Sequence, residues 1–280
     1  MHEFTNGSLV FEVTDVQPAA PNGETVILLH GFPEDRWSWS GLIPGLTSAG
    51  FRSLAPDLRG YSPRARPAAR SAYTLRKLAE DVLALADAAR AERVHLVGQD
   101  WGAALAWYLA ARRPDRVRSL TALSVPHPYA FMRAMVTSPQ ILRSWYMIAN
   151  QLPWLPELAL SVKDQTVRAL IRSGLDAESA ARYAQRTDMR GPVNWYRAMP
   201  LSLTRPVGSV AVPTLYIRGA EDRYITRAAA ESCRRYVRGA YRFVTLSGAG
   251  HWLPERDWDR IGPLLGEHLG GVVGRLDTSA

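Results

Sequence analysis

The feature that most constrains the fold is a short apolar run that occurs three times in the first hundred residues. It reads TVILLHG at residues 25–31, FRSLAPD at 51–57 and RVHLVGQ at 93–99. Apolar runs of strand length are typical of parallel strands that are covered on both faces. Between the second and third runs, Thr74 precedes apolar residues at helical spacing over residues 75–89. Strands that alternate with helices predict a mostly parallel sheet with helices on both faces.

Strand patterns continue until the middle of the chain, stop, and then resume. Residues 8–16 and 117–128 read as strands before the interruption, and residues 212–222 and 241–251 after it. Core helices are expected near 101–113, 226–238 and 257–268, and the last residues, from about 270, are expected to fray. The interruption predicts helices near 139–150, 156–173, 176–187 and 192–199. We therefore expect a core domain of residues 1–126 and 209–280 and an inserted helical cap of residues 127–208.

Composition narrows the class of protein without giving its function. The chain has 280 residues, 47% hydrophobic and 21% charged, which is ordinary for a soluble globular protein. A net charge of +8 could suggest an anionic partner, but the arginines are scattered and no nucleic-acid motif accompanies them. We interpret them as surface composition and expect no nucleic-acid partner.

The number of cysteines and the length of the apolar segments bear on the cellular location of the protein. Cys233 is the only cysteine, so neither an intrachain disulfide nor a cysteine-based metal site is expected. The first residues lack a secretory signal pattern, and no apolar stretch is long enough to span a membrane. The expectation is a cytoplasmic protein without a membrane span, present as a monomer or homodimer.

Four loops that follow predicted strands carry unusual residues: HGFPED at 30–35, GQDWG at 98–102, RGAEDR at 218–223 and SGAGHW at 247–252. Active groups of open α/β sheets gather in such loops, beyond the carboxyl ends of the strands. Each loop alone has an ordinary explanation, such as a turn, an acid that favours a helix start, or a structural histidine. Together, Asp100, Asp222 and His251 follow the nucleophile–acid–histidine order of hydrolases that usually use serine, with aspartate in the nucleophile position.

The motifs HGFPE, GQDWG, GAED and GAGHW resemble those of the epoxide hydrolases of the α/β-hydrolase fold, to which haloalkane dehalogenases are closely related. The resemblance extends from about residue 8 to residue 268. As a set the motifs are specific for a hydrolase with an aspartate nucleophile, and less specific between these two activities. The resemblance implies an α/β-hydrolase fold, in which a mostly parallel central sheet has helices on both faces and an inserted helical cap.

The resemblance also implies a mechanism that converts an epoxide and water to a vicinal diol. Asp100 would attack a saturated carbon and form a covalent alkyl–enzyme ester, a step that needs no base because a carboxylate has no proton to lose. His251, oriented by Asp222, would activate the water that hydrolyses this ester. The backbone N–H groups of Phe32 and Trp101 would stabilise the resulting oxyanion.

The leaving group separates the two activities. An epoxide oxygen leaves as a strongly basic alkoxide and needs a proton donor, for which a tyrosine is suited. The resemblance assigns that role to two cap tyrosines, Tyr196 in NWYR and Tyr146 in SWYM, although core packing is the ordinary explanation of a Trp-Tyr pair. Against a dehalogenase, Phe32 stands where many of those enzymes have a halide-binding asparagine, although Trp101 could still bind halide.

The remaining expectations concern the pocket and its ligands. Phe32, Trp37, Trp101 and Trp252 are expected to line an apolar site for a small hydrophobic epoxide, with weaker candidates at Phe131, Met135 and Trp145. No cofactor or metal is expected, and His30 is expected to brace its loop. An inactive hydrolase scaffold that serves as a binding protein is the alternative from another class. It is disfavoured because the three triad residues and both tyrosines are present.

Overall fold

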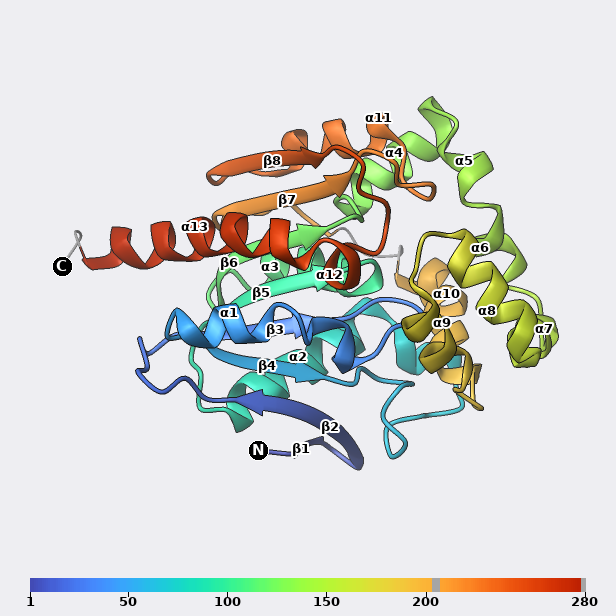
Figure 1. Cartoon of the computed structure of the whole chain (residues 1–280), viewed down its shortest axis with the longest axis horizontal. Helices are drawn as coiled ribbons and strands as arrows, with labels where there is room; N and C mark the ends of the chain where they lie inside the picture. Colours follow the sequence, from blue (N-terminus) through green and yellow to red (C-terminus); the bar gives the residue numbers. More distant parts are fainter. Residues whose placement is uncertain (203–206, 278–280) are drawn as a thin grey trace.

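The computed structural model describes residues 1–202 and 207–277, and of residues 274–277 the backbone alone. Within these residues the chain forms an eight-stranded sheet in the order β1-β2-β4-β3-β5-β6-β7-β8 (Figure 1). Strand β2 runs antiparallel to β1 and β4, and the neighbours from β4 to β8 are parallel. The strands are β1 (Glu3–Asn6), β2 (Leu9–Val16), β3 (Thr25–Leu29), β4 (Arg52–Pro56), β5 (Val94–Gln99), β6 (Val117–Leu123), β7 (Thr214–Gly219) and β8 (Tyr241–Leu246).

Strand β3 shows why the apolar runs form the centre of the sheet. All five of its residues are buried, and successive side chains point to opposite faces, as strand geometry requires. Ile27 and Leu29 pack in the hydrophobic core on one face, whereas Val26 and Leu28 pack in the core on the other. Both faces therefore need apolar residues, which explains a continuous run in place of an alternating one.

Helices cover both faces of the sheet, as expected. The first face packs against α2 (Leu75–Ala88), α3 (Trp101–Arg112) and the 3₁₀ helix η3 (Ser232–Tyr236). The second packs against α1 (Ile43–Ser48) and α13 (Trp258–Asp277), the long helix in front of the sheet in Figure 1. The short elements η1 (Arg36–Trp39), η2 (Arg70–Tyr73), α11 (Arg227–Glu231) and α12 (Leu253–Arg256) complete the part outside the insertion. Because α13 is helical to Asp277, the expected fraying from about residue 270 is wrong for the described residues.

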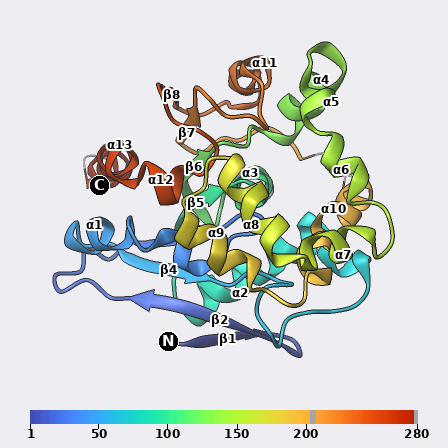
Figure 2. The same ribbon diagram turned by 45° about the vertical axis from the view of Figure 1, so that its right-hand side comes forward.

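Within the described residues, seven helices lie between β6 and β7. These helices, here called the cap, stand beside the carboxyl ends of the parallel strands (Figures 1 and 2). They are α4 (Pro128–Thr137), α5 (Gln140–Arg143), α6 (Trp145–Ala149), α7 (Leu155–Ser161), α8 (Lys163–Arg172), α9 (Ala177–Ala184) and α10 (Arg190–Ser202). The domain limits at residues 127 and 208 stay a prediction, and residues 203–206 lie outside the described residues.

Several elements differ from the sequence-based expectation. Strand β1 and helices α1 and α4 were not expected, and the helices expected over residues 139–150 and 156–173 are each two helices. Helix α4 begins at Pro128, where the backbone N–H of Tyr129 donates to the His127 side chain, so the prolines begin a helix as well as ending a strand. Val162 leaves the helical conformation between α7 and α8.

The cap is attached to the core by close backbone contacts. Gly191 of α10 lies against Gly60, so closely that a Cβ on Gly191 would come within 2.5 Å of the Gly60 Cα. Next to this contact, the Trp195 indole N–H donates to the Arg59 carbonyl at 2.8 Å. Trp195 is almost fully buried. Helix α10 is therefore fixed to the core at the level of its first turns.

Exposed apolar side chains gather on the cap. All but three of the large hydrophobic side chains that are exposed in the described chain lie between residues 132 and 171. The most exposed are Val136 at 84%, Leu142 at 74% and Trp145 at 67%. Among the described helices, none has the length and apolarity that crossing a bilayer would require.

Candidate active site

Asp100 stands at a sharp turn between β5 and α3. Its φ of 50° and ψ of −118° are uncommon for a residue with a side chain, which marks a strained position. The neighbours have no room for side chains: a Cβ on Gly102 would lie 2.0 Å from the Leu29 carbonyl oxygen, and one on Gly98 would lie 2.4 Å from the Gly102 carbonyl oxygen. The glycines of GQDWG thus permit the turn that presents the Asp100 carboxylate beyond the strand end.

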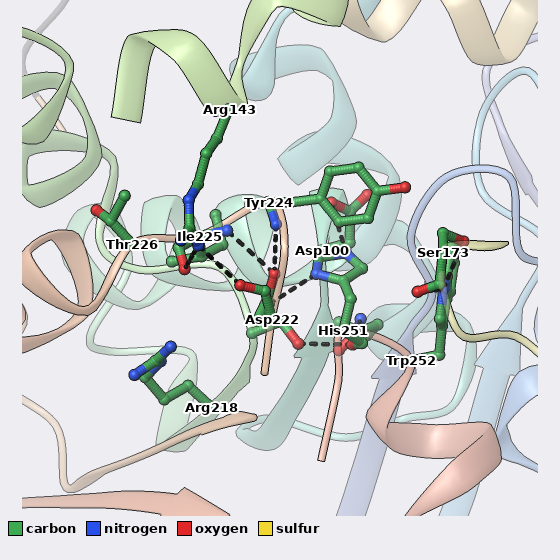
Figure 3. A network of polar contacts seen from close by, with 12 residues as sticks. Asp100, Arg143, Ser173, Arg218, Asp222, Tyr224, Ile225, Thr226, His251 and Trp252 are labelled. Atoms are coloured by element: carbon green, nitrogen blue, oxygen red, sulfur yellow. Dashed lines mark hydrogen bonds and ion pairs between the residues drawn. The ribbon is translucent and has the colours of Figure 1, made fainter. Parts of the chain in front are cut away.

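The two oxygens of Asp100 have different partners. Oδ1 accepts a hydrogen bond from the backbone N–H of Phe32 at 2.9 Å. Oδ2 lies 3.5 Å from His251 Nε2 (Figure 3). The loop after β3 comes this close because Gly31 has no side chain: a Cβ there would lie 2.4 Å from the Asp100 Cβ. One oxygen therefore faces a backbone donor and the other faces the histidine.

His251 is oriented by Asp222, at 2.8 Å between Nδ1 and Oδ2. The other oxygen of Asp222 accepts from the backbone N–H groups of Tyr224 at 2.8 Å and Ile225 at 3.0 Å (Figure 3). With these bonds the fully buried carboxylate is satisfied, and its position is fixed. The Nδ1 bond to a carboxylate leaves Nε2 directed at Asp100.

The His251 main chain is also held. Its carbonyl oxygen accepts hydrogen bonds from the Gln99 amide at 2.8 Å and from the Ser124 hydroxyl at 2.7 Å. Burial alone would lower the pKa of His251, but the Asp222 and Asp100 carboxylates outweigh it and raise the pKa well above its ordinary value of 6.5. The imidazolium is therefore favoured as long as both carboxylates are charged.

Two cavities meet at Asp100. The larger, of about 1230 Å³, is lined by Phe32, His251 and Trp252 among others, and the smaller, of about 80 Å³, by Trp101. Asp100, Tyr146 and Tyr196 line both. The two cap tyrosines and the candidate nucleophile thus stand at the junction of the cavities.

The tyrosines form an aromatic cluster over Asp100. The Tyr196 ring packs edge-on against Phe32 at 5.2 Å, Trp101 at 5.1 Å and Tyr146 at 6.0 Å between centroids. Burial, assisted by the negative charge of Asp100, raises the pKa values of Tyr146 and Tyr196 well above 10. Both phenols are therefore neutral and able to donate hydrogen bonds at any ordinary pH.

Most of the residues expected in the pocket line one of the cavities, but Trp37 does not. Trp145 lines the larger cavity and Phe131 the smaller. Trp37 is absent from both linings and is 50% exposed, with the Arg36 guanidinium 5.2 Å from its ring centroid. The assignment of Trp37 to the pocket is therefore corrected: η1 turns its ring toward solvent. Met135, a weaker candidate, also lies outside both linings.

His30 braces its loop, as expected. Its Nδ1 lies 2.9 Å from the Gly31 carbonyl, and its Nε2 accepts from the Leu58 N–H at 3.1 Å. Burial lowers the pKa of His30 to about 4, so the ring is neutral. Among the described residues, no three or more histidine, cysteine or acidic side chains gather into a set that could hold a metal ion.

Two buried acids near the site, Glu34 and Glu255, were not predicted from the sequence. Glu34 Oε2 accepts from the Gly31 N–H at 2.6 Å, and Glu255 accepts from the Tyr183 hydroxyl of helix α9. Burial, then the charges of Glu255 and Asp100, raise the pKa of Glu34 well above 4.5, and burial raises that of Glu255 to about 7. Glu34 lies in the HGFPE motif, but nothing in the sequence signals its neighbour 221 positions later.

Comparison with known proteins decides the family. Residues 24–173 match the family described as alpha/beta hydrolase fold. The chain belongs to this family. It is 32% identical to AB hydrolase superfamily protein YfhM of Bacillus subtilis, over 89% of this chain and 91% of that protein. It is also 32% identical to Epoxide hydrolase A of Mycobacterium tuberculosis, over 96% of both chains.

Solved structures agree with the sequence comparison. The crystal structure of Epoxide Hydrolase A from Mycobacterium thermoresistibile has a TM-score of 0.83 and 27% sequence identity. The match covers 96% of this chain and 97% of that one. The α/β-hydrolase fold and the resemblance to epoxide hydrolases, both expected from the sequence, are confirmed.

Proposed function

We propose that this protein hydrolyses epoxides to vicinal diols through a covalent ester on Asp100. The relatives named epoxide hydrolases, which match almost the whole chain, support this reaction class. The observation that carries the proposal is the junction of the two cavities. There a carboxylate with one oxygen free of backbone donors faces two neutral tyrosines.

In the first step, Asp100 Oδ2 attacks an epoxide carbon, and the C–O bond of the ring breaks. Oδ2 is the better candidate because Oδ1 is engaged by the Phe32 N–H. Tyr146 and Tyr196 hydrogen-bond to the ring oxygen, and one of them gives it a proton as the bond breaks. Positioned proton donors of this kind typically speed a reaction by roughly 10²- to 10⁴-fold.

Ester formation changes the charge next to His251. Once Asp100 is an ester, its negative charge is gone, and with it part of the interaction that raises the pKa of His251. The histidine can then become neutral and accept a proton from water, while Asp222 remains as its partner. The first step thus prepares the base that the second step needs.

In the second step, water activated by His251 attacks the carbonyl carbon of the Asp100 ester. The negative charge develops on Oδ1, within reach of the Phe32 N–H, and the N–H of Trp101 at the start of α3 is the proposed second donor. The intermediate collapses by breaking the bond to the diol oxygen, which receives the proton from His251. The collapse leaves a carboxylic acid on Asp100 that contains one oxygen from water. This acid releases its proton to solvent and becomes a carboxylate, and the tyrosine takes up a proton from solvent, so the cycle neither consumes nor produces protons.

A dehalogenase reaction is less well supported. A halide leaves as a stable anion and needs N–H donors, not acids. Tyrosines with raised pKa values at the reacting centre are better suited to the strongly basic oxygen of an epoxide.

Single turnover in ¹⁸O-labelled water tests the ester. With enzyme in excess over styrene oxide, we expect one label in the peptide that contains Asp100. The peptide that contains Asp222 should carry none and serves as the internal control. Label found in the diol alone would mean that water attacks the epoxide directly, and the proposal would be wrong.

A further inference from the structure

The loop that carries Asp222 is held by side chains of the cap. This segment, residues 222–226 and here called the acid loop, lies between β7 and α11 and contains the acid that orients His251. The short cap helix α5 places two side chains against it, Gln140 and Arg143. A loop of the core is therefore fixed by a helix that belongs to the insertion.

Gln140 is fully buried, and each polar atom of its amide is hydrogen-bonded. Nε2 donates to the Tyr224 carbonyl at 2.6 Å and to the Ser144 hydroxyl at 3.0 Å. Oε1 accepts from the backbone N–H of Thr226 at 2.8 Å. Because a buried amide costs free energy unless its donors and its acceptor find partners, these bonds stabilise one position of the loop. Gln140 thus fixes the acid loop at two points of its backbone.

Arg143 holds the same loop from three residues further along α5, on the same side of the helix. Its Nη1 donates to the carbonyl oxygen of Asp222 at 2.9 Å and to that of Ile225 at 3.2 Å (Figure 3). With the bond from Gln140, three of the five carbonyl oxygens of the acid loop accept from side chains of α5. The backbone of the loop is therefore held along most of its length.

The acid loop contacts His251 in two ways. Asp222 accepts the bond from Nδ1, and the ring of Tyr224 packs edge-on against the imidazole at 4.8 Å between centroids. The Asp222 carboxylate also accepts from the N–H groups of Tyr224 and Ile225, which ties it to the loop backbone. A displacement of the loop would therefore change the length and direction of the bond that orients His251.

Attachment of the cap to the core does not by itself explain this arrangement. Helix α10 fixes the cap independently, where Trp195 donates to the Arg59 carbonyl at 2.8 Å. In the described part of the chain, by contrast, every hydrogen bond from the side chains of Gln140 and Arg143 to the core ends on the acid loop. The contact is directed at the segment that carries the triad acid.

We infer that Gln140 and Arg143 are positioning residues for the histidine that activates water. The inference rests on the proposed epoxide hydrolysis and assigns both residues to its second step. Asp100 attacks the epoxide without a base, so ester formation does not depend on the position of the acid loop. Ester hydrolysis does depend on it, because His251 takes a proton from water while Asp222 holds the ring in place.

Gln140→Met tests this assignment, since methionine is equally long and unbranched but cannot form these hydrogen bonds. Enzyme in excess is mixed with styrene oxide and quenched at successive times, and the ester on the Asp100 peptide is quantified by mass spectrometry. We expect ester formation to stay within about twofold of the wild-type rate and ester decay to slow by at least about tenfold, because a misplacement of about 1 Å can cost roughly 10²-fold in rate.

Gln151→Met is the matched control, with the same substitution at another glutamine of the cap. Its Nε2 donates to the carbonyl oxygens of Tyr196 at 2.7 Å and Met147 at 3.3 Å. Any effect should therefore fall on ester formation, through the proposed proton donor, and ester decay should keep the wild-type rate. If Gln140→Met does not fold, Arg143→Gln decides, because this side chain is more exposed and its loss should slow ester decay in the same way.

The outcomes separate the inference from the proposed function. A folded variant of Gln140 or Arg143 with unchanged ester decay, or with formation and decay slowed equally, would show a structural tether and overturn the inference. Slower decay in Gln151→Met to the same extent would overturn it as well, since general loosening of the cap would then be the cause. If the wild-type protein forms no ester on Asp100, the proposed function fails, and the inference fails with it.

Discussion

At the scale of single residues, the environment of Tyr146 and Tyr196 determines what these phenols can do. Their burial beside the Asp100 carboxylate makes the phenolate form costly, so each hydroxyl keeps its proton. A phenol that resists ionisation is a weak acid toward water. It can still donate to an alkoxide that forms in contact with it. In the proposed mechanism, the carboxylate that attacks the ring thus also helps to keep the proton donor protonated.

The double substitution Tyr146→Phe with Tyr196→Phe tests this role. Loss of both hydroxyls should reduce kcat for epoxide hydrolysis by at least about 10²-fold, because the alkoxide then leaves without a proton donor. Tyr108→Phe removes the hydroxyl of a buried tyrosine of helix α3 that lines neither cavity, and serves as the control. Full activity in the double variant would show that the cap tyrosines are structural.

The buried acids Glu34 and Glu255 give the fold a dependence on pH. The pKa of Glu255 rises from 4.5 to about 7, so the folded state holds a proton that the unfolded chain has already released. Its contribution to stability is therefore fully present below pH 4.5 and is lost as the pH rises toward 7. Two buried histidines act in the opposite direction, because burial lowers the pKa values of His30 and His127 to about 4.

Glu255→Gln isolates the contribution of this acid. Relative to the variant, the free energy of unfolding of the wild type should fall by roughly 1 kcal/mol per pH unit between pH 4.5 and pH 7. The amide oxygen can still accept from Tyr183, so packing is largely kept. Urea titrations at intervals of half a pH unit measure the difference, and parallel curves for the two proteins would contradict the assigned pKa.

Sequence reasoning found the residues whose motifs are local and missed those whose environment is made by distant contacts. Asp100 was recognisable because Gly98 and Gly102 stand next to it and permit its turn. Glu255 owes its raised pKa to burial, and the groups that surround it, Glu34 and Tyr183, come from distant parts of the chain. Trp37 was misplaced for the same reason. Nothing in the sequence shows on which side of η1 its ring lies.

At the scale of elements, helix α10 links the core to the site. Its Gly191 lies against Gly60 of the core, and its Tyr196 stands over Asp100. The closeness of the glycine contact therefore sets the depth at which the tyrosine enters the cavity. A substitution at Gly191 should therefore displace Tyr196, the proposed proton donor on the same helix.

Gly191→Ala should consequently impair activity as well as stability. The added methyl group would come within 2.5 Å of the Gly60 backbone, so α10 has to shift outward. We expect a loss of roughly 2 kcal/mol in stability and a fall in kcat larger than the change in KM. Gly45→Ala is the control, because its methyl group meets no atom within 4 Å. It should stabilise α1 by up to about 1 kcal/mol. Equal behaviour of the two variants would contradict the contact.

Elements with a strong hydrophobic pattern in the sequence were predicted, and those that depend on tertiary contacts were not. Strands β3, β5 and β7 are buried throughout and largely apolar, and they were evident, whereas β1 has four residues and is defined by its pairing with β2. In the cap, the prolines before α4 read equally well as the end of a strand or the first turn of a helix.

At the scale of the whole molecule, apolar surface is concentrated on one side. The exposed side chains of the cap, such as Val136, Leu142 and Leu158, have few counterparts on the described core. A patch of this kind should bind hydrophobic dyes and columns. Replacing Leu142 and Leu158 by Gln should shorten retention on a phenyl column and leave kcat unchanged, because neither residue lines a cavity. Unaltered retention would show that the patch does not act as a unit.

Because exposed apolar side chains are concentrated on one side, the folded protein is amphipathic as a whole, as a surfactant is. Trp145, Leu152 and Leu155 are exposed on the cap and also line the larger cavity. At the boundary between water and an oil droplet, the protein should turn this side toward the oil, and surface tension should fall as it adsorbs. An epoxide that dissolves poorly in water would then meet the enzyme at the face on which the cavity opens.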